Sequence, residues 1–439
     1  PAPAKGLATS LVSTRQNLAL ALCDLPEQLA YGAFNWDSAT PLGIFGTSAS
    51  GRTAALRQLA SSAAQAGLVT HVIGADLNQL ALPNAALAGS QLDTFHPCEV
   101  LRLTQLALEG KLRGQLLLID DLDCVGEAID TVLGLGEGRD VLEKLVNASR
   151  RGLFALALAG DLANAPMRWC ANISQRLYLG VCSDTLADQA GLKRCQQAPN
   201  QVGAGVLTLA SHWCAAQILL APVLPTSAAN LPASVVDSPA SASDLPVNPS
   251  DTTTALAAAP VVALPEIVPT CPPWALGLGG DQAQPWCPQL SQGLAIIGPA
   301  GSGRSTALAR VYDILQATDP ALAQRAIFID NLDQACPSAI NTVETALDAG
   351  TPVFATALTS RAANTYSGAL SQLRSLSPLL LLAPGLGEGT QLANVRLTRW
   401  LDPHRQHLPG RGLVIASSQI TPIQICQNTS PTFAANPQV

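Results

Sequence analysis

The chain has 439 residues, of which 48% are hydrophobic and 13% charged, and its formal net charge is −7. A chain this apolar can bury large cores, which excludes a mostly disordered protein, and its length allows about two or three domains. The negative net charge excludes a basic footprint for nucleic acid spread over the whole chain.

Three further features bear on the compartment and the extent of the protein. The eleven cysteines are scattered and no pair has C-x-x-C spacing, so they favour a reducing, cytoplasmic compartment over a disulfide or zinc framework. No uninterrupted apolar run of about 18 residues appears, so we expect no membrane-spanning helix. Because the sequence begins with Pro1 rather than Met, we expect it to be a fragment of a longer protein.

In chain order, the first unit opens with an apolar strand at 41–45. The loop 46–53 follows, with the sequence Gly-Thr-Ser-Ala-Ser-Gly-Arg-Thr, and a helical pattern then runs over 54–66. A second apolar run, 115–119, ends in Asp120 and Asp121, and after a helical stretch another strand is predicted at 153–159. The unit closes with Gly203-Ala-Gly205 and a short strand pair.

A stretch rich in Pro, Ala, Ser and Thr at 226–270 interrupts this pattern, and we interpret it as a flexible linker. Beyond it the same order of signals returns. The strand 293–297 precedes the loop 298–305, Gly-Pro-Ala-Gly-Ser-Gly-Arg-Ser, and a helix to about 317. The run 325–329 ends in Asp330 and Asn331, the strand 352–358 follows, and Gly410-Arg-Gly412 precedes the last strands.

This repeat predicts tandem domains, each a mainly parallel sheet flanked by helices, because continuous apolar strands alternate with helices. The expected fold class is α/β with two P-loop NTPase domains of the RecA-like kind. The predicted divisions are an N-terminal extension at 1–17, a degenerate first domain at 18–225, the linker at 226–270, a second domain at 271–428 and a tail at 429–439.

Both loops match the pattern G-x-x-x-x-G-[KR]-[ST] between a strand and a helix. Glycines let the backbone curl so that N–H groups point at phosphate oxygens, and the helix N-terminus adds its positive end. We therefore expect ATP to bind at both loops. The expected nucleotide contacts are Gly46, Ser48, Ser50, Gly51, Arg52 and Thr53 in the first unit, and Gly298, Gly301, Ser302, Gly303, Arg304, Ser305 and Thr306 in the second.

The position that normally holds Lys is Arg52 in one loop and Arg304 in the other. Arg keeps the charge but carries a planar fork on a longer stem, so it does not replace a Lys point charge cleanly. Two such changes favour sites used for binding or structure more than for turnover. The second loop is also the better match, because the first has Ser48-Ala49-Ser50 where a further glycine would help.

The acids complete the predicted sites. The hydroxyl of Thr53 or Ser305 and the carboxylate of Asp120 or Asp330 are the expected ligands of Mg²⁺, the metal that accompanies ATP. The following residue, Asp121 or Asn331, holds the position that polarises the attacking water, so these two are the candidate catalytic residues. Asp121 is shorter than Glu and Asn331 cannot accept a proton, so hydrolysis is expected to be weak in the first unit and weaker in the second.

Four residues nearby have two interpretations each. Asp123 and Asp333 either cap helices or belong to the site. Thr356 and Thr359 end the strand after the second acid, where they are either polar sensors of the nucleotide or ordinary core residues.

The tandem arrangement resembles the FtsK/SpoIIIE superfamily, and in particular the C-terminal ATPase modules of EccC-type proteins of type VII secretion. The segments Leu22–Pro26 with Trp36-Asp37, and Leu276–Gly280 with Pro285-Trp286, are similar to the family's leading segment. Leu408–Gly412 with Ile423-Gln424 matches its closing turn, whereas Gly203–Gly205 with Gln217 matches it poorly, and Leu379–Pro384 resembles its Leu-rich segment.

The resemblance implies ATP binding, assembly in rings or stacks, and movement of DNA or of export substrates. It implies that this chain holds two trailing modules, weakly hydrolytic at most, which serve regulation and bind the signal segment of an export substrate. Active modules upstream, a hexamer-like homo-oligomer in the full-length protein and a place on the cytoplasmic face of the membrane are further implications. Two alternatives stay open: a DNA-translocating motor of the FtsK kind, and a P-loop scaffold that holds no nucleotide.

Overall fold

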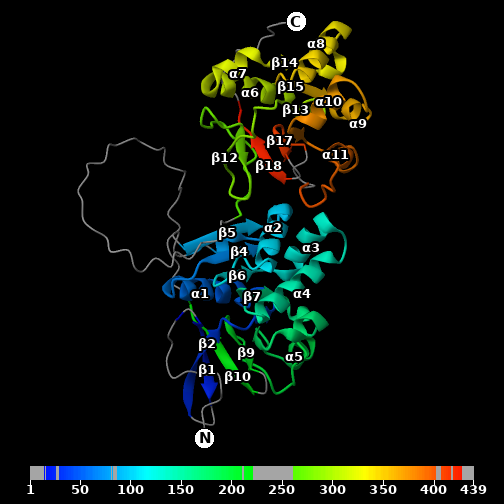
Figure 1. Cartoon of the computed structure of the whole chain (residues 1–439). Helices are drawn as coiled ribbons and strands as arrows, with labels where there is room; N and C mark the ends of the chain where they lie inside the picture. The colour runs from blue at the N-terminus through cyan, green and yellow to red at the C-terminus, as the bar shows by residue number, and fades with distance from the viewer. Residues whose placement is uncertain are drawn as a thin grey trace, which may run out of the picture.

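The computed structural model describes residues 14, 16–25, 29–80, 82, 87–209, 212–220, 261–401, 407–416 and 419–427. Within these ranges the chain forms two α/β units, drawn in blue to green and in green to red in Figure 1. Each unit has one mixed sheet with helices on both faces, so the α/β class expected from the alternating strands and helices is confirmed.

The first unit is built on a ten-stranded sheet with the strand order β2-β1-β10-β9-β8-β3-β7-β6-β4-β5. Its strands are β1 (Asn17–Leu25), β2 (Ala30–Asp37), β3 (Leu42–Gly46), β4 (Thr70–Gly74), β5 (Ala88–Asp93), β6 (Leu116–Ile119), β7 (Ala155–Gly160), β8 (Gln175–Leu179), β9 (Ala204–Leu209) and β10 (His212–Ile218). Its α-helices are α1 (Arg52–Gln65), α2 (Pro97–Leu108), α3 (Leu122–Leu133), α4 (Glu137–Arg150) and α5 (Asp184–Gln189). Short 3₁₀ turns are η2 (Leu77–Leu80), η4 (Leu162–Asn164) and η5 (Arg168–Asn172).

The second unit repeats this plan on an eight-stranded sheet with the order β12-β11-β18-β17-β16-β13-β15-β14. Its strands are β11 (Gly277–Gly279), β12 (Gln284–Trp286), β13 (Leu294–Gly298), β14 (Ile327–Ile329), β15 (Val353–Leu358), β16 (Leu379–Leu382), β17 (Arg411–Ala416) and β18 (Gln419–Ile425). Its helices are α6 (Arg304–Thr318), α7 (Pro320–Arg325), α8 (Pro337–Asp348), α9 (Thr359–Ala363), α10 (Ala369–Leu376) and α11 (Leu386–Ala393), with the 3₁₀ turn η6 (Leu332–Gln334).

The strands that bear the loops are parallel and buried on both faces. All residues of β3, β6 and β13 are buried, as expected for central parallel strands covered by helices on each side. In the first unit α1 covers one face, and α2, α3 and α4 cover the other. Helix α3 shows why: Leu122, Val125, Ile129 and Val132 recur at helical spacing and form a single buried stripe.

The two sheets correspond strand for strand except at one edge. In the first unit, β4, β5 and α2 lie between the loop helix and the strand that ends in the acid. In the second, only α7 lies there, and β14 is the last strand of the described sheet. Helix α2 therefore belongs to the first unit alone, and in Figure 1 it lies on the side that faces the second unit.

The contact between the units runs through α2 and the described end of the linker. Arg102 of α2 holds both carboxylate oxygens of Asp281, in the turn between β11 and β12, with a shortest distance of 2.9 Å. The backbone N–H of Val261 donates to the hydroxyl of Ser90 in β5. Arg411 of β17 donates to the carbonyl of Leu264 at 2.9 Å. Residues 261–270 are thus packed against both units, whereas 221–260 lie outside the described residues.

No helix among the described residues is both long enough and apolar enough to cross a bilayer.

A close approach between two strands tests this packing. A Cβ at Gly412 would lie 2.4 Å from the carbonyl oxygen of Leu381, whereas one at Gly387, exposed within α11, would meet nothing within 4 Å. We predict that Gly412→Ala destabilises the second unit by about 2–3 kcal/mol, and that Gly387→Ala stabilises it by up to about 1 kcal/mol through helix propensity. Urea unfolding followed by circular dichroism measures both, and equal effects of the two substitutions would contradict the predicted strand contact.

Candidate functional site

Each predicted phosphate loop joins a strand to a helix at the carboxyl edge of its sheet, since β3 ends at Gly46 and β13 at Gly298. The helices begin after Gly51 and Gly303, which adopt left-handed conformations at φ 107° and 92°. A side chain is strained at such angles, which explains the glycines. Neither helix has a side-chain cap, so its first N–H groups are left facing the loop, as anion binding requires.

The first loop keeps its curl without its middle glycine. Gly301 has φ 78°, and the matching Ala49 has φ 59°. A residue with a Cβ in this conformation costs roughly 1–2 kcal/mol relative to the right-handed one. Replacing the middle glycine by Ala49 therefore adds backbone strain to the first loop, while both loops keep a left-handed conformation at this position.

A glycine turn late in each unit holds each loop from behind. The N–H of Gly203 donates to the carbonyl of Ser50, and that of Gly410 to the carbonyl of Ser302, both at 2.9 Å. The sequence placed a Gly-x-Gly turn near the end of both units, but the first turn matched the family's closing turn poorly. Their geometry is nevertheless equivalent, because the signal lies in backbone atoms rather than in side chains.

A glutamine in the last strand supports each of these turns. Gln217 donates to the carbonyl of Val202 at 3.2 Å, and Gln424 to that of Pro409 at 2.9 Å. In both units the glutamine therefore bonds to the residue directly before the turn glycine. Gln217 and Gln424 therefore have equivalent contacts, although the segment that contains Gln217 matches the family's closing turn poorly.

Serines at equivalent positions line the inside of both loops. The hydroxyl oxygens of Ser50 and Ser302 are buried and have no hydrogen-bond partner in the described structure. They lie over Gly46 and Gly298, where a Cβ would come within 2.3 and 2.4 Å of them. Ser48, Ser305 and Thr306 are more exposed, at the loop tip and in the first turn of α6.

The predicted metal ligands meet in pairs. The hydroxyl of Thr53 donates to Asp120 and that of Ser305 to Asp330, each at 2.8 Å. One hydroxyl and one carboxylate leave room for phosphate oxygens and water, which suits Mg²⁺. Among the described residues no cluster of three or more His, Cys, Asp or Glu side chains could hold a metal by itself.

Asp120 is partly buried, and this desolvation raises the pKa of its carboxyl, partly offset by the hydrogen bond from Thr53 and the charge of Arg52. In the second loop, Nη1 of Arg304 is buried and has no hydrogen-bond partner in the described part of the chain. Buried donors of this kind usually have a partner, so this nitrogen is available to a phosphate oxygen. The uncapped helix N–H groups, the orphan donors and the hydroxyl–carboxylate pairs together fit a magnesium–nucleotide complex.

The candidate catalytic residues share an unusual backbone. Asp121 and Asn331 have φ 58° and 57°, a left-handed conformation that Asp and Asn tolerate better than most residues. The N–H of Asp121 bonds to its neighbour's carboxylate, at 3.1 Å from Oδ1 of Asp120. The N–H of Asn331 instead donates to the hydroxyl of Thr356 at 2.7 Å.

Thr356 also donates its hydroxyl proton to Oδ1 of Asp330. It is fully buried in β15, so it is a core residue with polar contacts, and its role as a sensor of the nucleotide stays a prediction. By strand register Thr356 faces Ile296 as Ala159 faces Ile44, so the first unit has an alanine at this place. Thr359 is buried in α9 and its hydroxyl has no hydrogen-bond partner in the described structure.

Asp123 and Asp333 do not cap helices, so that interpretation is wrong. Asp123 accepts a hydrogen bond from Asn164 in η4 at 3.0 Å. Asp333 lies against Arg361 of α9, with 3.6 Å between its carboxylate and the guanidinium. Each aspartate therefore ties the acid-bearing strand to the strand beside it, an arrangement that spacing along the chain does not reveal.

Comparisons with known proteins bear on the fold. No family model and no curated protein matches this sequence. Among solved structures, EssC (ATPases 2 and 3) from Geobacillus thermodenitrificans is similar at 10% identity and a TM-score of 0.57, covering 97% of this chain and 99% of that one. Thermomonospora curvata EccC (ATPases 2 and 3), in complex with a signal sequence peptide, is similar at 15% identity and a TM-score of 0.53, covering 97% of both chains.

The cytoplasmic domain of the type VII secretion ATPase EccC from Thermomonospora curvata is also similar, at 15% identity and a TM-score of 0.50, and this chain spans 62% of it. Over nearly its whole length the chain therefore has the fold of tandem P-loop ATPase domains.

The raised pKa of Asp120 has a consequence for stability. When the pKa of a carboxyl is higher in the folded than in the unfolded state, the free energy of unfolding falls as pH rises between the two pKa values. Above this interval the whole loss of stability remains. We predict that Asp120→Asn stabilises the chain at pH 7 and that this gain shrinks toward pH 4. Urea midpoints at both pH values measure it. Asp330→Asn is the control, because Asp330 is exposed, and an equal gain there would contradict the burial argument.

Proposed function

We propose that this chain is a pair of ATP-binding modules of a secretion ATPase of the type VII kind, with weak or no hydrolysis, serving regulation and recognition of the export substrate. The observation that carries the proposal is the double occurrence of one arrangement: an uncapped helix N-terminus behind a curled loop, with a hydroxyl–carboxylate pair beside it. Two copies of this geometry are unlike a chance match to a short motif.

The residues have the following proposed roles. The loop N–H groups and the guanidinium of Arg52 or Arg304 hold the phosphates of ATP. Thr53 with Asp120, and Ser305 with Asp330, hold Mg²⁺, whose chemistry is to neutralise charge on the phosphate oxygens. The serine hydroxyls inside the loops, Ser50 and Ser302, are available to the same oxygens.

Weak turnover follows from the residue beside each acid. The side-chain amide of Asn331 cannot take a proton from an attacking water, and the backbone N–H of Asn331 already donates to the hydroxyl of Thr356. Asp121 is ionisable but reaches less far than Glu would. Arg in place of Lys also favours binding over turnover, because a planar guanidinium does not replace the Lys point charge cleanly.

Recognition of an export signal is supported by the fold shared with EccC (ATPases 2 and 3), which was solved with a signal sequence peptide bound. On the same basis we propose neighbouring ATPase modules upstream, a homo-oligomer in the full-length protein, and a location at the cytoplasmic face of the membrane. The net charge of −7 disfavours a DNA-translocating motor, which needs a basic surface for the phosphate backbone.

Nucleotide binding has a direct test. A ligand that binds only the folded state stabilises it by about 2.7 kcal/mol at a hundredfold excess over its Kd. We predict that Mg·ATP raises the melting temperature with slow or absent release of phosphate. Arg304→Lys is expected to change the affinity for ATP or the rate of its turnover. Arg168→Lys is expected to change neither, because Arg168 is exposed and lies outside both loops. If both substitutions are silent and ATP does not shift the melting temperature, the chain is a scaffold without nucleotide.

The cargo is tested separately. We predict that a labelled peptide carrying a type VII export signal binds to the chain in a fluorescence-polarisation assay. A scrambled peptide of the same composition is expected not to bind. Duplex DNA is expected neither to bind at physiological salt nor to stimulate phosphate release. Rapid turnover stimulated by DNA would assign the chain to the DNA-motor class instead.

A further inference from the structure

The sheet of the second unit ends at β14, which has no further strand beside it among the described residues. In the first unit the corresponding strand is β6, and β4 pairs with it in parallel on this side. All residues of β6 are buried, whereas all three of β14 are only partly buried. In Figure 1, β14 lies on the side of the second unit away from the first unit. An apolar strand with an open edge is a template for pairing with another strand.

The hydrogen bonds of β14 show which backbone groups face the open edge. The N–H of Ile327 donates to the carbonyl of Pro352 at 3.1 Å, so Ile327 and Ile329 direct their backbone groups toward β15. The backbone groups of successive residues in a strand point to opposite sides, so those of Phe328 and Asp330 face away from β15.

The first unit shows how such groups are used. The N–H of Asp120, which corresponds to Asp330, donates to the carbonyl of Ile73 in β4 at 2.8 Å. One donor at the edge of β14 is already bonded within the second unit, because the N–H of Ala326 donates to the carbonyl of Leu322 in α7 at 3.0 Å. The groups left at the edge are therefore the N–H groups of residues 328 and 330 and the carbonyls of residues 326 and 328.

These groups match those of a second copy of the same strand. When two copies of β14 run antiparallel about a two-fold axis at Phe328, the N–H and carbonyl of Phe328 bond reciprocally with those of Phe328 in the other copy. The N–H of Asp330 then meets the carbonyl of Ala326 in the other copy. No donor is left over, whereas a parallel strand placed like β4 would find the N–H of Ala326 already bonded.

The side chains at this edge favour the same antiparallel pair. The ring of Phe328 stacks on that of Phe354 with 4.9 Å between centroids and meets the ring of Tyr312 edge-on at 5.2 Å. A residue on the two-fold axis lies opposite itself, so the second copy continues this row of rings, and aromatic cross-strand pairs stabilise sheets. Arg325 and Asp330, both exposed, stand at the two ends of the strand. Antiparallel order brings these opposite charges together, whereas parallel order in the same register sets like charges opposite each other.

We propose that β14 is a dimerisation edge, at which two copies of this chain pair antiparallel about Phe328 and join their second sheets into one. The second copy takes the place that β4 fills in the first unit, and it bonds to the backbone N–H of Asp330. The inference depends neither on nucleotide binding nor on the assembly proposed above, because it rests on the backbone groups and side chains of β14 itself.

Sedimentation velocity of the full chain over a range of concentrations measures the dimer and its Kd. Phe328→Pro removes the reciprocal donor but no bond to β15, because this N–H faces the open edge, where proline is tolerated. Arg325→Asp sets like charges against each other. Each substitution is expected to raise the Kd of the dimer about tenfold or more. Arg168→Asp reverses an exposed charge in the first unit and is expected to leave this Kd unchanged. Circular dichroism checks that each variant is folded.

A second measurement needs no substitution. Hydrogen exchange read by mass spectrometry on peptides that span 326–331 reports on the N–H groups of Phe328 and Asp330. We expect these groups to exchange slowly at high protein concentration and rapidly at low concentration. The N–H of Asp120, bonded within the first unit, is the internal control and is expected to exchange slowly at both.

Three results would overturn the inference. The first is a chain that stays monomeric at every concentration, with rapid exchange at residues 328 and 330. The second is slow exchange there that does not depend on concentration, which means that the chain covers its own edge; if truncation after Gln427 abolishes this protection, residues 428–439 are the cover. The third is a dimer that neither Phe328→Pro nor Arg325→Asp weakens, because such a dimer uses another surface.

Discussion

The N–H groups at the first turns of α1 and α6 are the constraint around which both units are organised. A helix start with no capping side chain leaves donors that water or an anion must satisfy, and the loop before it curves so that more N–H groups point the same way. Gly51 and Gly303 make that curve possible. The late glycine turns, through Gly203 and Gly410, then hold the loops from behind by backbone hydrogen bonds.

The two sites differ in how their acids are held. In the second, Asp330 accepts hydrogen bonds from Ser305 and Thr356, and Thr356 also fixes the backbone of Asn331. In the first, Ala159 replaces this threonine and the carboxylate of Asp120 is desolvated. Each acid accepts two hydrogen bonds, but those of Asp330 both come from hydroxyls, and Asp330 stands next to a residue without acid–base chemistry. The first has an ionisable neighbour and a strained loop. In the function proposed above, each site combines features that favour binding with a residue that disfavours turnover.

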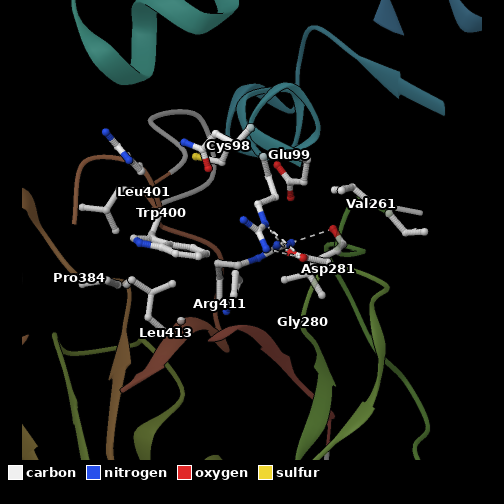
Figure 2. A pocket seen from close by; sticks show the side chains of 18 residues that line it. Cys98, Glu99, Val261, Gly280, Asp281, Pro384, Trp400, Leu401, Arg411 and Leu413 are labelled. Carbon is white, nitrogen blue, oxygen red and sulfur yellow. Dashed lines mark hydrogen bonds and ion pairs between the residues drawn. The ribbon is translucent and has the colours of Figure 1, made fainter. Parts of the chain in front are cut away.

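The insertion of β4, β5 and α2 in the first unit gives the pair its asymmetry. Helix α2 supplies Arg102 to the ion pair with Asp281, and its Glu99 lines a cavity between the units (Figure 2). A bidentate arginine–carboxylate pair fixes orientation as well as distance. One helix that the second unit lacks therefore makes much of the contact between the two units.

The sequence by itself determined the parts that depend on neighbours along the chain. The buried parallel strands, the loops at 46–53 and 298–305, and the acids Asp120 and Asp330 all carry local signals, because apolar runs and glycine positions report burial and backbone angles directly. Only the tertiary structure decided which distant groups meet. The bond from Thr356 to Asp330, the bonds from Gly203 and Gly410 to the loop serines, and the place of Glu99 at the contact between the units depend on packing between separate elements. Such packing leaves no periodic trace in the sequence.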